Sequence, residues 1–240
     1  MSGEADGFEA IVLAGGLGTR LRSVVSSVPK VLAPVAGRPF LAHVLSRLRR
    51  AGCARVVVAV GHLREQVMQQ FRDRFEDMPV RYSIEESPLG TGGAIRKALA
   101  GMAGARQIVL NGDTWMEVDY GAMLALHENE GARLTVAVTA LPDVARYGAV
   151  EIDDQRRILR FSEKGESKPG LINGGVYAVE RGIFGGFLLP AAFSFETDFM
   201  APCCTVLRPV AFLTRGLFVD IGVPADYALA QDLLRERAGK

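Results

Sequence analysis

A glycine-rich turn follows the first apolar run of the chain and limits the possible folds more than any other feature. Residues 10–13, Ala-Ile-Val-Leu, predict a short buried strand that leads directly into this turn. The turn holds glycines at three nearby positions, namely Gly15, Gly16 and Gly18. Glycines allow positive φ and close approach of a ligand, and consecutive amide N–H groups can then point at phosphate oxygens. Arg20 and Lys30 add positive charge, so we expect a phosphate-binding loop.

The spacing of this turn excludes two common phosphate-binding motifs. A Walker A loop needs a lysine directly after its last glycine, and no lysine follows Gly18 in that place. A dinucleotide fingerprint needs a third glycine and a helix that begins within the turn, but the spacing ends at Leu21 and a proline-containing loop follows. The remaining alternative is a turn that only reverses the chain, which would leave Arg20 and Lys30 without a role.

The same segment resembles the signature of sugar-1-phosphate nucleotidyltransferases, A-G-G-x-G-T-R-L followed further on by P-K. The resemblance extends over residues 9–230. It implies that the strand end and the turn bind a nucleotide through Leu13, Ala14, Gly15, Gly16, Gly18 and Thr19. It also implies that Arg20 holds the triphosphate and the leaving pyrophosphate, and that Lys30 lies near the reacting phosphates.

Alternating apolar strands and amphipathic helices predict the fold class. Strands are expected at 10–13, 55–60, 80–84, 107–110 and 134–139, and helices from Pro39 to Gly52 and at 63–75, 91–102 and 119–130. We therefore expect an α/β fold with a doubly wound, mixed and mostly parallel sheet, which the resemblance makes a Rossmann-like nucleotidyltransferase fold. A hairpin of 147–152 with 158–162 and a strand at 171–179 predict a smaller antiparallel portion that binds the sugar.

We expect a single nucleotidyltransferase domain over residues 1–240. Within it, 9–140 would mainly bind the nucleotide, 141–222 would mainly bind the sugar phosphate, and 223–240 would form a C-terminal helix. Longer relatives carry a further C-terminal domain, and we expect this chain to be the catalytic core alone.

Composition excludes several kinds of partner. Lys and Arg number 28 against 27 Asp and Glu, so no basic surface suited to nucleic acid is expected. No apolar run is long enough to span a bilayer, and residues 1–9 lack the apolar centre of a signal peptide. The three cysteines form no C-x-x-C and are expected to be buried thiols. We therefore expect a cytoplasmic protein without nucleic-acid or membrane partners, and a homo-oligomer stays possible.

A second tight turn follows the predicted strand 80–84. Thr91 is expected to cap the helix that begins there. In the family the matching segment packs against the nucleobase, which assigns Pro88, Gly90 and Thr91 to the nucleotide site. Taken alone, the segment would be an ordinary helix entry, so this assignment depends on the first turn.

Glu85, at the end of the same strand, is the expected base reader and predicts guanine. A carboxylate only accepts hydrogen bonds, and guanine offers two adjacent donors, whereas uracil and thymine offer one donor between acceptors. In thymidylyl- and uridylyl-transferring relatives this place is typically a glutamine. The alternative is that Glu85 is a solvated strand end and that Glu86 or a backbone carbonyl reads the base.

Two aspartates are candidate metal ligands. Asp113 follows the predicted strand 107–110, and ligands of open α/β sheets bind at the carboxyl ends of strands. Mg²⁺ prefers one or two carboxylates together with phosphate oxygens and waters. Asn111-Gly112-Asp113 matches the metal-binding position of the family, and Asp220 matches its second metal aspartate. The alternative for Asp113 is a polar turn at a strand end.

The resemblance places the sugar 1-phosphate in the second half of the chain. Lys164 is expected to bind the phosphate and place the nucleophile, Glu163 to bind a sugar hydroxyl, and Asn173 to add a donor and an acceptor. Three further members of the sugar-phosphate set are Gly148, Gly174 and the weaker candidate Glu196. A Glu-Lys pair is more often a solvated surface pair, so its role depends on this context.

The implied reaction is attack by a sugar 1-phosphate oxygen on the α-phosphorus of a nucleoside triphosphate, with release of pyrophosphate. Within the family the chain is most similar to D-glycero-D-manno-heptose 1-phosphate guanylyltransferases, at residues 21–25, 82–86 and 171–177. That similarity implies GTP and a heptose 1-phosphate as substrates and Mg²⁺ as cofactor. Mannose 1-phosphate with GTP, glucose 1-phosphate with UTP or dTTP, and an inactive regulatory subunit that binds sugar nucleotides stay open.

Overall fold

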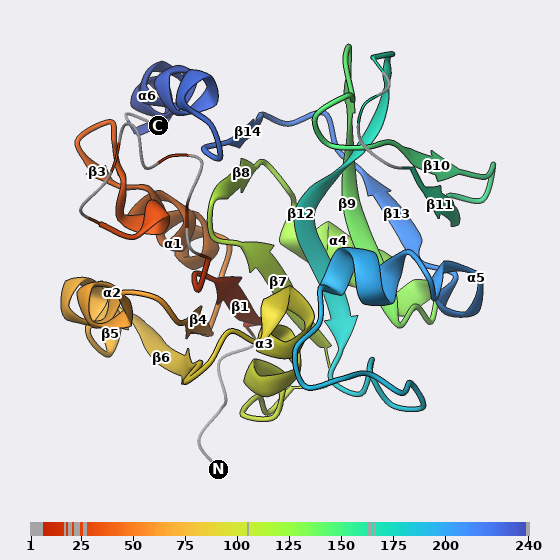
Figure 1. Cartoon of the computed structure of the whole chain (residues 1–240), viewed down its shortest axis with the longest axis horizontal. Helices are drawn as coiled ribbons and strands as arrows, with labels where there is room; N and C mark the ends of the chain where they lie inside the picture. Colours follow the sequence, from red (N-terminus) through yellow and green to blue (C-terminus); the bar gives the residue numbers. More distant parts are fainter. Residues whose placement is uncertain are drawn as a thin grey trace.

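A mixed sheet forms the centre of the computed structural model, which describes residues 7–16, 18, 21, 25, 28–104, 106–162, 165 and 167–238 (Figure 1). β1 (Glu9–Leu13) pairs in parallel with β4 (Arg55–Val60) on one side and β7 (Arg106–Asn111) on the other. β6 (Met78–Ile84) continues the parallel part beyond β4. β1 and β4 are almost wholly apolar because both faces of the sheet are covered there.

The second half of the sheet is mostly antiparallel. β12 (Gly170–Glu180) lies antiparallel to β7 and to β9 (Leu134–Leu141). The hairpin of β10 (Val150–Ile152) and β11 (Ile158–Phe161) extends the sheet beside β12. β13 (Val210–Leu213) pairs in parallel with β9. The predicted mixed sheet and its antiparallel portion are therefore confirmed.

Helices cover both faces of the sheet, and alternate residues of β1 point to opposite cores. Ala10 and Val12 belong to the core packed by α1 (Phe40–Arg50), α2 (Arg64–Phe71), α4 (Tyr120–Asn129) and α6 (Pro224–Ala238). Ile11 belongs to the opposite core, which α3 (Gly90–Leu99) packs. In the part of the chain that the structure describes, none of the helices combines the length and hydropathy needed to cross a membrane. The cytoplasmic location stays a prediction.

Several short elements lie outside the central part of the sheet. β14 (Phe218–Asp220) pairs with β8 (Thr114–Met116) in an antiparallel ribbon of their own, which sets Asp220 opposite Thr114. The remaining short elements are η2 (Lys30–Leu32), β2 (Pro34–Val35), β3 (Arg38–Pro39), β5 (Arg74–Phe75), η3 (Phe195–Met200) and α5 (Cys204–Leu207). The β8–β14 ribbon matters most, because it brings the chain near residue 220 back to the carboxyl end of β7.

Two expectations about helix ends are wrong. The helix predicted at 63–75 ends at Phe71, because Arg72 adopts a φ of 52° and β5 then turns back to pair with β6. Thr91 does not cap α3, because the helix begins at Gly90 and Leu89 occupies the N-cap position. The Thr91 hydroxyl is used in a contact with η3 instead, which bears on the site described next.

Candidate active site

A cavity of about 790 Å³ opens at the carboxyl ends of the parallel strands. Its volume falls within the range of about 300–1,000 Å³ that is common for small-molecule sites. The cavity brings together the described residues predicted to bind the nucleotide, namely Leu13, Ala14, Gly15, Gly16, Gly18, Glu85, Pro88, Gly90 and Thr91, with Lys30 and Asp113. These residues come from the end of β1 and the glycine turn, from η2, from the second turn and from the segment after β7, so the two predicted turns line one cavity.

Close contacts with Glu85 and Lys30 require glycine at two positions of the first turn. A Cβ on Gly15 would lie 2.7 Å from Oε1 of Glu85. Gly18 adopts a φ of 59°, and a Cβ there would lie 3.1 Å from Cβ of Lys30. The turn can therefore contact both the base-side carboxylate and the lysine stem only because these positions lack a side chain.

Glu85 has one carboxylate oxygen committed to its own turn. The backbone N–H of Leu89 donates to Oε2 of Glu85 at 3.0 Å, which fixes the turn before α3. The other oxygen, Oε1, lies against Gly15 at the cavity wall. Glu86 instead forms an exposed ion pair with Arg64 at 3.1 Å at the rim of the same cavity. The assignment of Glu85 as the base reader stays a prediction.

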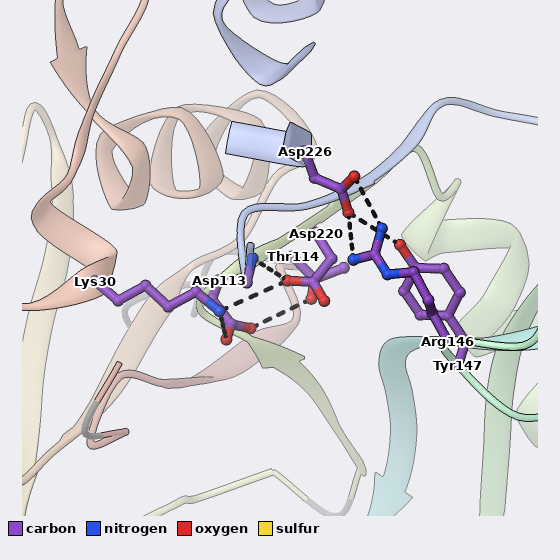
Figure 2. Close-up of polar contacts among 8 residues, drawn as sticks. Lys30, Asp113, Thr114, Arg146, Tyr147, Asp220 and Asp226 are labelled. Carbon is purple, nitrogen blue, oxygen red and sulfur yellow. Dashed lines mark hydrogen bonds and ion pairs between the residues drawn. The ribbon is translucent and has the colours of Figure 1, made fainter. Parts of the chain in front are cut away.

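Lys30, Asp113 and Asp220 form a charged cluster at the end of the cavity (Figure 2). Nζ of Lys30 donates to Oδ2 of Asp113 at 2.6 Å and lies 3.6 Å from Oδ1 of Asp220. The lysine side chain is only 12% exposed, so its ammonium is largely removed from bulk water. Asp113 lies two residues after the end of β7, whereas Asp220 ends β14 and reaches the cluster through the β8–β14 ribbon. The N–H of Ile221 donates to the backbone oxygen of Asp113 at 3.0 Å and fixes this approach.

The carboxylate of Asp220 is largely buried and lies close to that of Asp113. Burial raises the pKa of Asp220 above its usual range, and the neighbouring charge of Asp113 raises it further. Lys30 and the N–H of Gly222, which donates to Oδ1 at 2.7 Å, oppose this shift. Two adjacent carboxylates that need positive charge are a suitable donor set for a hard divalent cation such as Mg²⁺, which also takes phosphate oxygens and waters. Within the described ranges, three or more His, Cys, Asp or Glu do not gather at any one place to hold a metal.

The residues predicted on the sugar side make contacts within the protein. Asn173 donates from Nδ2 to the hydroxyl of Tyr177 at 2.9 Å, and its Oδ1 accepts from the N–H of Gly175 at 3.0 Å. Gly174 packs so closely against Met116 that an added Cβ would overlap the sulfur atom. Gly148 adopts a φ of 78° and donates its N–H to the oxygen of Val144 at 2.9 Å. Their roles in sugar binding stay predictions.

Glu196, predicted on the sugar side, contacts Thr91, predicted on the nucleotide side. The hydroxyl of Thr91 donates to Oε2 of Glu196 at 2.9 Å and accepts from the N–H of Phe195 at 2.8 Å. The hydroxyl of Tyr177 donates to Oε1 of Glu196 at 3.2 Å. The Thr91 hydroxyl is therefore committed to η3, which leaves the backbone of the turn as its contribution to the cavity.

Four predicted site residues lie outside the described residues, namely Thr19, Arg20, Glu163 and Lys164. Sequence reasoning also missed a pair beside the charged cluster, Arg146 and Asp226 (Figure 2). Asp226 lies in the first turn of α6, where an acid is ordinarily explained by the helix dipole and suggests no distant partner. The sequence signal for the pair was therefore limited to Arg146, which stands directly before Tyr147 and Gly148.

Comparisons with known proteins show which family the chain belongs to. The model of the nucleotidyl transferase family matches residues 9–237. The chain is 40% identical to a D-glycero-alpha-D-manno-heptose 1-phosphate guanylyltransferase of Aneurinibacillus thermoaerophilus over 227 residues, which cover 95% of this chain and 98% of that protein. It is also 40% identical to the Campylobacter jejuni protein of the same name over 219 residues, covering 91% of this chain and 96% of that one.

Solved structures of a related protein have the same fold as this chain. HddC from Yersinia pseudotuberculosis superimposes with a TM-score of 0.86 at 34% identity and covers 95% of this chain and 99% of its own. A second structure of HddC, complexed with GMP-PN, has a TM-score of 0.83 at 33% identity, with the same coverage of both chains. The cavity, the charged cluster and these similarities lead to one assignment. The chain belongs to the nucleotidyl transferase family.

Proposed function

We propose that this protein transfers a guanylyl group from GTP to D-glycero-D-manno-heptose 1-phosphate, forming the GDP-sugar and pyrophosphate. The observation that carries the proposal is the cavity lined by the glycine turn, Lys30 and Asp113, with Asp220 beside Lys30. The choice of sugar and base is supported by the two relatives at 40% identity, whose names specify this reaction, and by the HddC structure with GMP-PN.

The residues of the chain would mainly position two anionic reactants and neutralise their charge. The N–H groups of the glycine turn and Arg20 would hold the triphosphate, and Lys30 would neutralise the reacting phosphates. Lys164 would place the attacking phosphate oxygen, with Glu163 and Asn173 at the sugar. No general base is required, because the attacking oxygen is already ionised at neutral pH. In this proposal residues 9–140 serve mainly the nucleotide and 141–222 mainly the sugar phosphate.

Asp113 and Asp220 would hold Mg²⁺, and the bound ion would polarise the α-phosphoryl group. Their suitability rests on the oxygen donors and on the mutual repulsion that raises the pKa of Asp220, after the larger effect of burial. Glu85 would read guanine with the carboxylate oxygen that Leu89 does not occupy. A guanine N1–H and 2-amino group would then donate to a carboxylate that is already held in place.

A mannose-1-phosphate guanylyltransferase is the second candidate. The chain is 31% identical to the Mycobacterium tuberculosis protein of that name but covers only 65% of it. The first candidate is preferred because the heptose enzymes are covered over nearly their whole length at higher identity. An inactive regulatory subunit is the least favoured reading, because the lysine and both aspartates of the cluster are present and in contact.

Release of pyrophosphate, measured with a panel of triphosphates and sugar 1-phosphates, tests the proposal. GTP with the heptose 1-phosphate should give the highest kcat/KM, and Asp113→Ala should remove the signal. Higher kcat/KM with mannose 1-phosphate would favour the second candidate, and a preference for UTP or dTTP would contradict guanylyl transfer. Binding of GTP and sugar phosphate without pyrophosphate release would indicate the regulatory subunit.

A further inference from the structure

The loop between β9 and β10 is tied to the first turn of α6 through the carboxylate of Asp226 (Figure 2). Arg146 donates from Nη1 to Oδ1 at 3.0 Å and from Nη2 to Oδ2 at 2.7 Å, a bidentate pair. The hydroxyl of Tyr147 donates to Oδ2 at 3.2 Å. The Asp226 side chain is 17% exposed and the Arg146 side chain 47% exposed, so the carboxylate is largely covered while the arginine stays partly in solvent. Bidentate arginine–carboxylate pairs fix geometry as well as adding stability.

The tied loop also packs on the strand that carries Asp220. The rings of Tyr147 and Phe218 meet edge to face, with centroids 5.2 Å apart. Phe218 stands two residues before Asp220 on β14, so both side chains lie on the same side of that strand. The loop therefore contacts both α6 and β14 at one point beside the charged cluster, so a movement of one of these segments would displace the others.

The backbone of the loop forms a tight turn at residues 144–148. The N–H groups of Tyr147 and Gly148 both donate to the oxygen of Val144 at 2.9 Å. The N–H of Val144 donates to the oxygen of Lys168, and the N–H of Gly165 donates to the oxygen of Ala145. Any rotation of the turn would therefore displace Gly165 and Lys168 as well.

The turn at residues 144–148 lies on the side of Asp113 and Asp220 from which the sugar 1-phosphate has to approach. In Figure 2, Lys30 reaches Asp113 and Asp220 from one side, while Arg146 and Tyr147 lie on the other, beyond Asp220. The glycine turn and Lys30 line the cavity assigned to the triphosphate. In phosphoryl transfer the attacking and leaving oxygens are roughly in line, so an attacking sugar phosphate has to approach from the side of residues 144–148.

We propose that Asp226 is a positioning residue that holds the turn 144–148 beside Asp220, so that the sugar 1-phosphate binds in the orientation needed for attack. Arg146 and Tyr147 transmit this constraint, and Gly148 lies at the end of the turn that they fix. The inference rests on the proposed function, because it concerns the second substrate of that reaction. It assigns a role in substrate placement to the C-terminal helix, which contributes no predicted ligand of its own.

Steady-state kinetics of Asp226→Asn test the role in substrate placement. A hydrogen bond to a charged group accounts for about a 10- to 150-fold effect, so we expect kcat/KM for the sugar phosphate to fall about 10- to 100-fold. KM for GTP should change by less than about threefold, because the triphosphate side does not contact Asp226. Arg146→Lys keeps the charge and loses the fork, so it should give an intermediate loss. Tyr147→Phe keeps the ring on Phe218 and should give the smallest loss.

Glu130→Gln is the matched control. Glu130 accepts from Nη2 of Arg157 at 2.6 Å, an ion pair that joins the region after α4 to the loop between β10 and β11, away from the cluster. Removing it should leave both KM values and kcat unchanged. Equal losses toward both substrates in Asp226→Asn, or no loss at all, would overturn the proposal.

Hydrogen exchange separates this inference from the proposed function. In Asp226→Asn the amides of residues 144–149 should exchange at least about tenfold faster than in the wild type, while those of β1 and β7 should not change. Unchanged exchange at 144–149 would show that Asp226 does not hold the turn. A wild type that releases no pyrophosphate from any substrate pair would contradict the proposed function, and the exchange comparison would still decide whether Asp226 holds the turn.

Discussion

Replacement of Lys30 by methionine should have opposite effects on metal binding and on turnover. The ammonium of Lys30 lies 2.6 Å from Oδ2 of Asp113 and 3.6 Å from Oδ1 of Asp220, between the two carboxylates. A divalent cation held by both aspartates needs the same oxygens. In the absence of nucleotide, Lys30 would therefore compete with the cation, and once phosphates are present it would gain another anionic partner.

The size of the effect follows from the contacts of the ammonium. The 2.6 Å contact is a hydrogen bond between charged groups, worth about 1.5–3 kcal/mol, or about 10- to 150-fold in an equilibrium constant. The contact at 3.6 Å is longer than a hydrogen bond and adds only Coulomb attraction. Lys30→Met keeps an unbranched stem beside Gly18 and removes the charge, so divalent cations should bind the free protein about 10- to 150-fold more tightly.

The assay is titration with Mn²⁺ followed by the electron paramagnetic resonance signal of the free ion, without nucleotide. Pyrophosphate release from the same preparation should fall strongly, because Lys30 no longer neutralises the reacting phosphates. Lys97→Met is the control, because the Lys97 ammonium donates to the backbone oxygen of Ile84 rather than to a carboxylate. Unchanged or weaker Mn²⁺ binding in Lys30→Met would refute the competition.

Three further predictions concern single side chains. Asp220→Ala should nearly abolish turnover while circular dichroism stays native, and near-normal Mg²⁺-dependent turnover would remove it from the metal site. Glu85→Gln should lower kcat/KM for GTP by about 10- to 100-fold, measured against UTP; unchanged base preference would show that another group reads guanine. His127 is buried and contacts Thr135, and burial above all lowers the pKa of its imidazole to about 4 from 6.5. Because only the unfolded chain takes up that proton between these values, stability should fall by up to about 3 kcal/mol as the pH drops from about 6.5 to about 4. Urea denaturation of the wild type and His127→Gln measures this, and an identical pH dependence in both would contradict it.

Strong apolar runs made most of the fold predictable. The strand predicted at 55–60 has the same bounds as β4, and the helix expected after Pro39 begins at Phe40. The helix predicted at 63–75 was too long, because its amphipathic period continues past Phe71 while pairing of β5 with β6 decides where it ends. Tertiary pairing of this kind leaves little trace in a local pattern.

The candidate site was predictable where one segment carries several of its residues. The glycine turn, the turn before α3 and the end of β7 are continuous motifs, and the structure gathers them around one cavity. The Arg146–Asp226 pair joins positions 80 residues apart, so no local spacing indicates it. The ribbon of β8 and β14 is similar, because three-residue strands are too short to show a period.

The contact between Thr91 and Glu196 shows why the two substrate sides cannot be assigned one residue at a time. The sequence places Thr91 with the nucleotide and Glu196 with the sugar, yet they share a hydrogen bond of 2.9 Å. The N–H of Gly92 donates to the oxygen of Phe193, and an added Cβ on Gly92 would overlap the Phe193 ring. The turn that faces the nucleotide cavity therefore cannot shift without breaking contacts to the segment that carries Glu196. A nucleotide bound at this turn and a sugar bound at Glu196 would therefore act on the same set of packed contacts, so substitutions at Thr91 or Glu196 should affect both substrates.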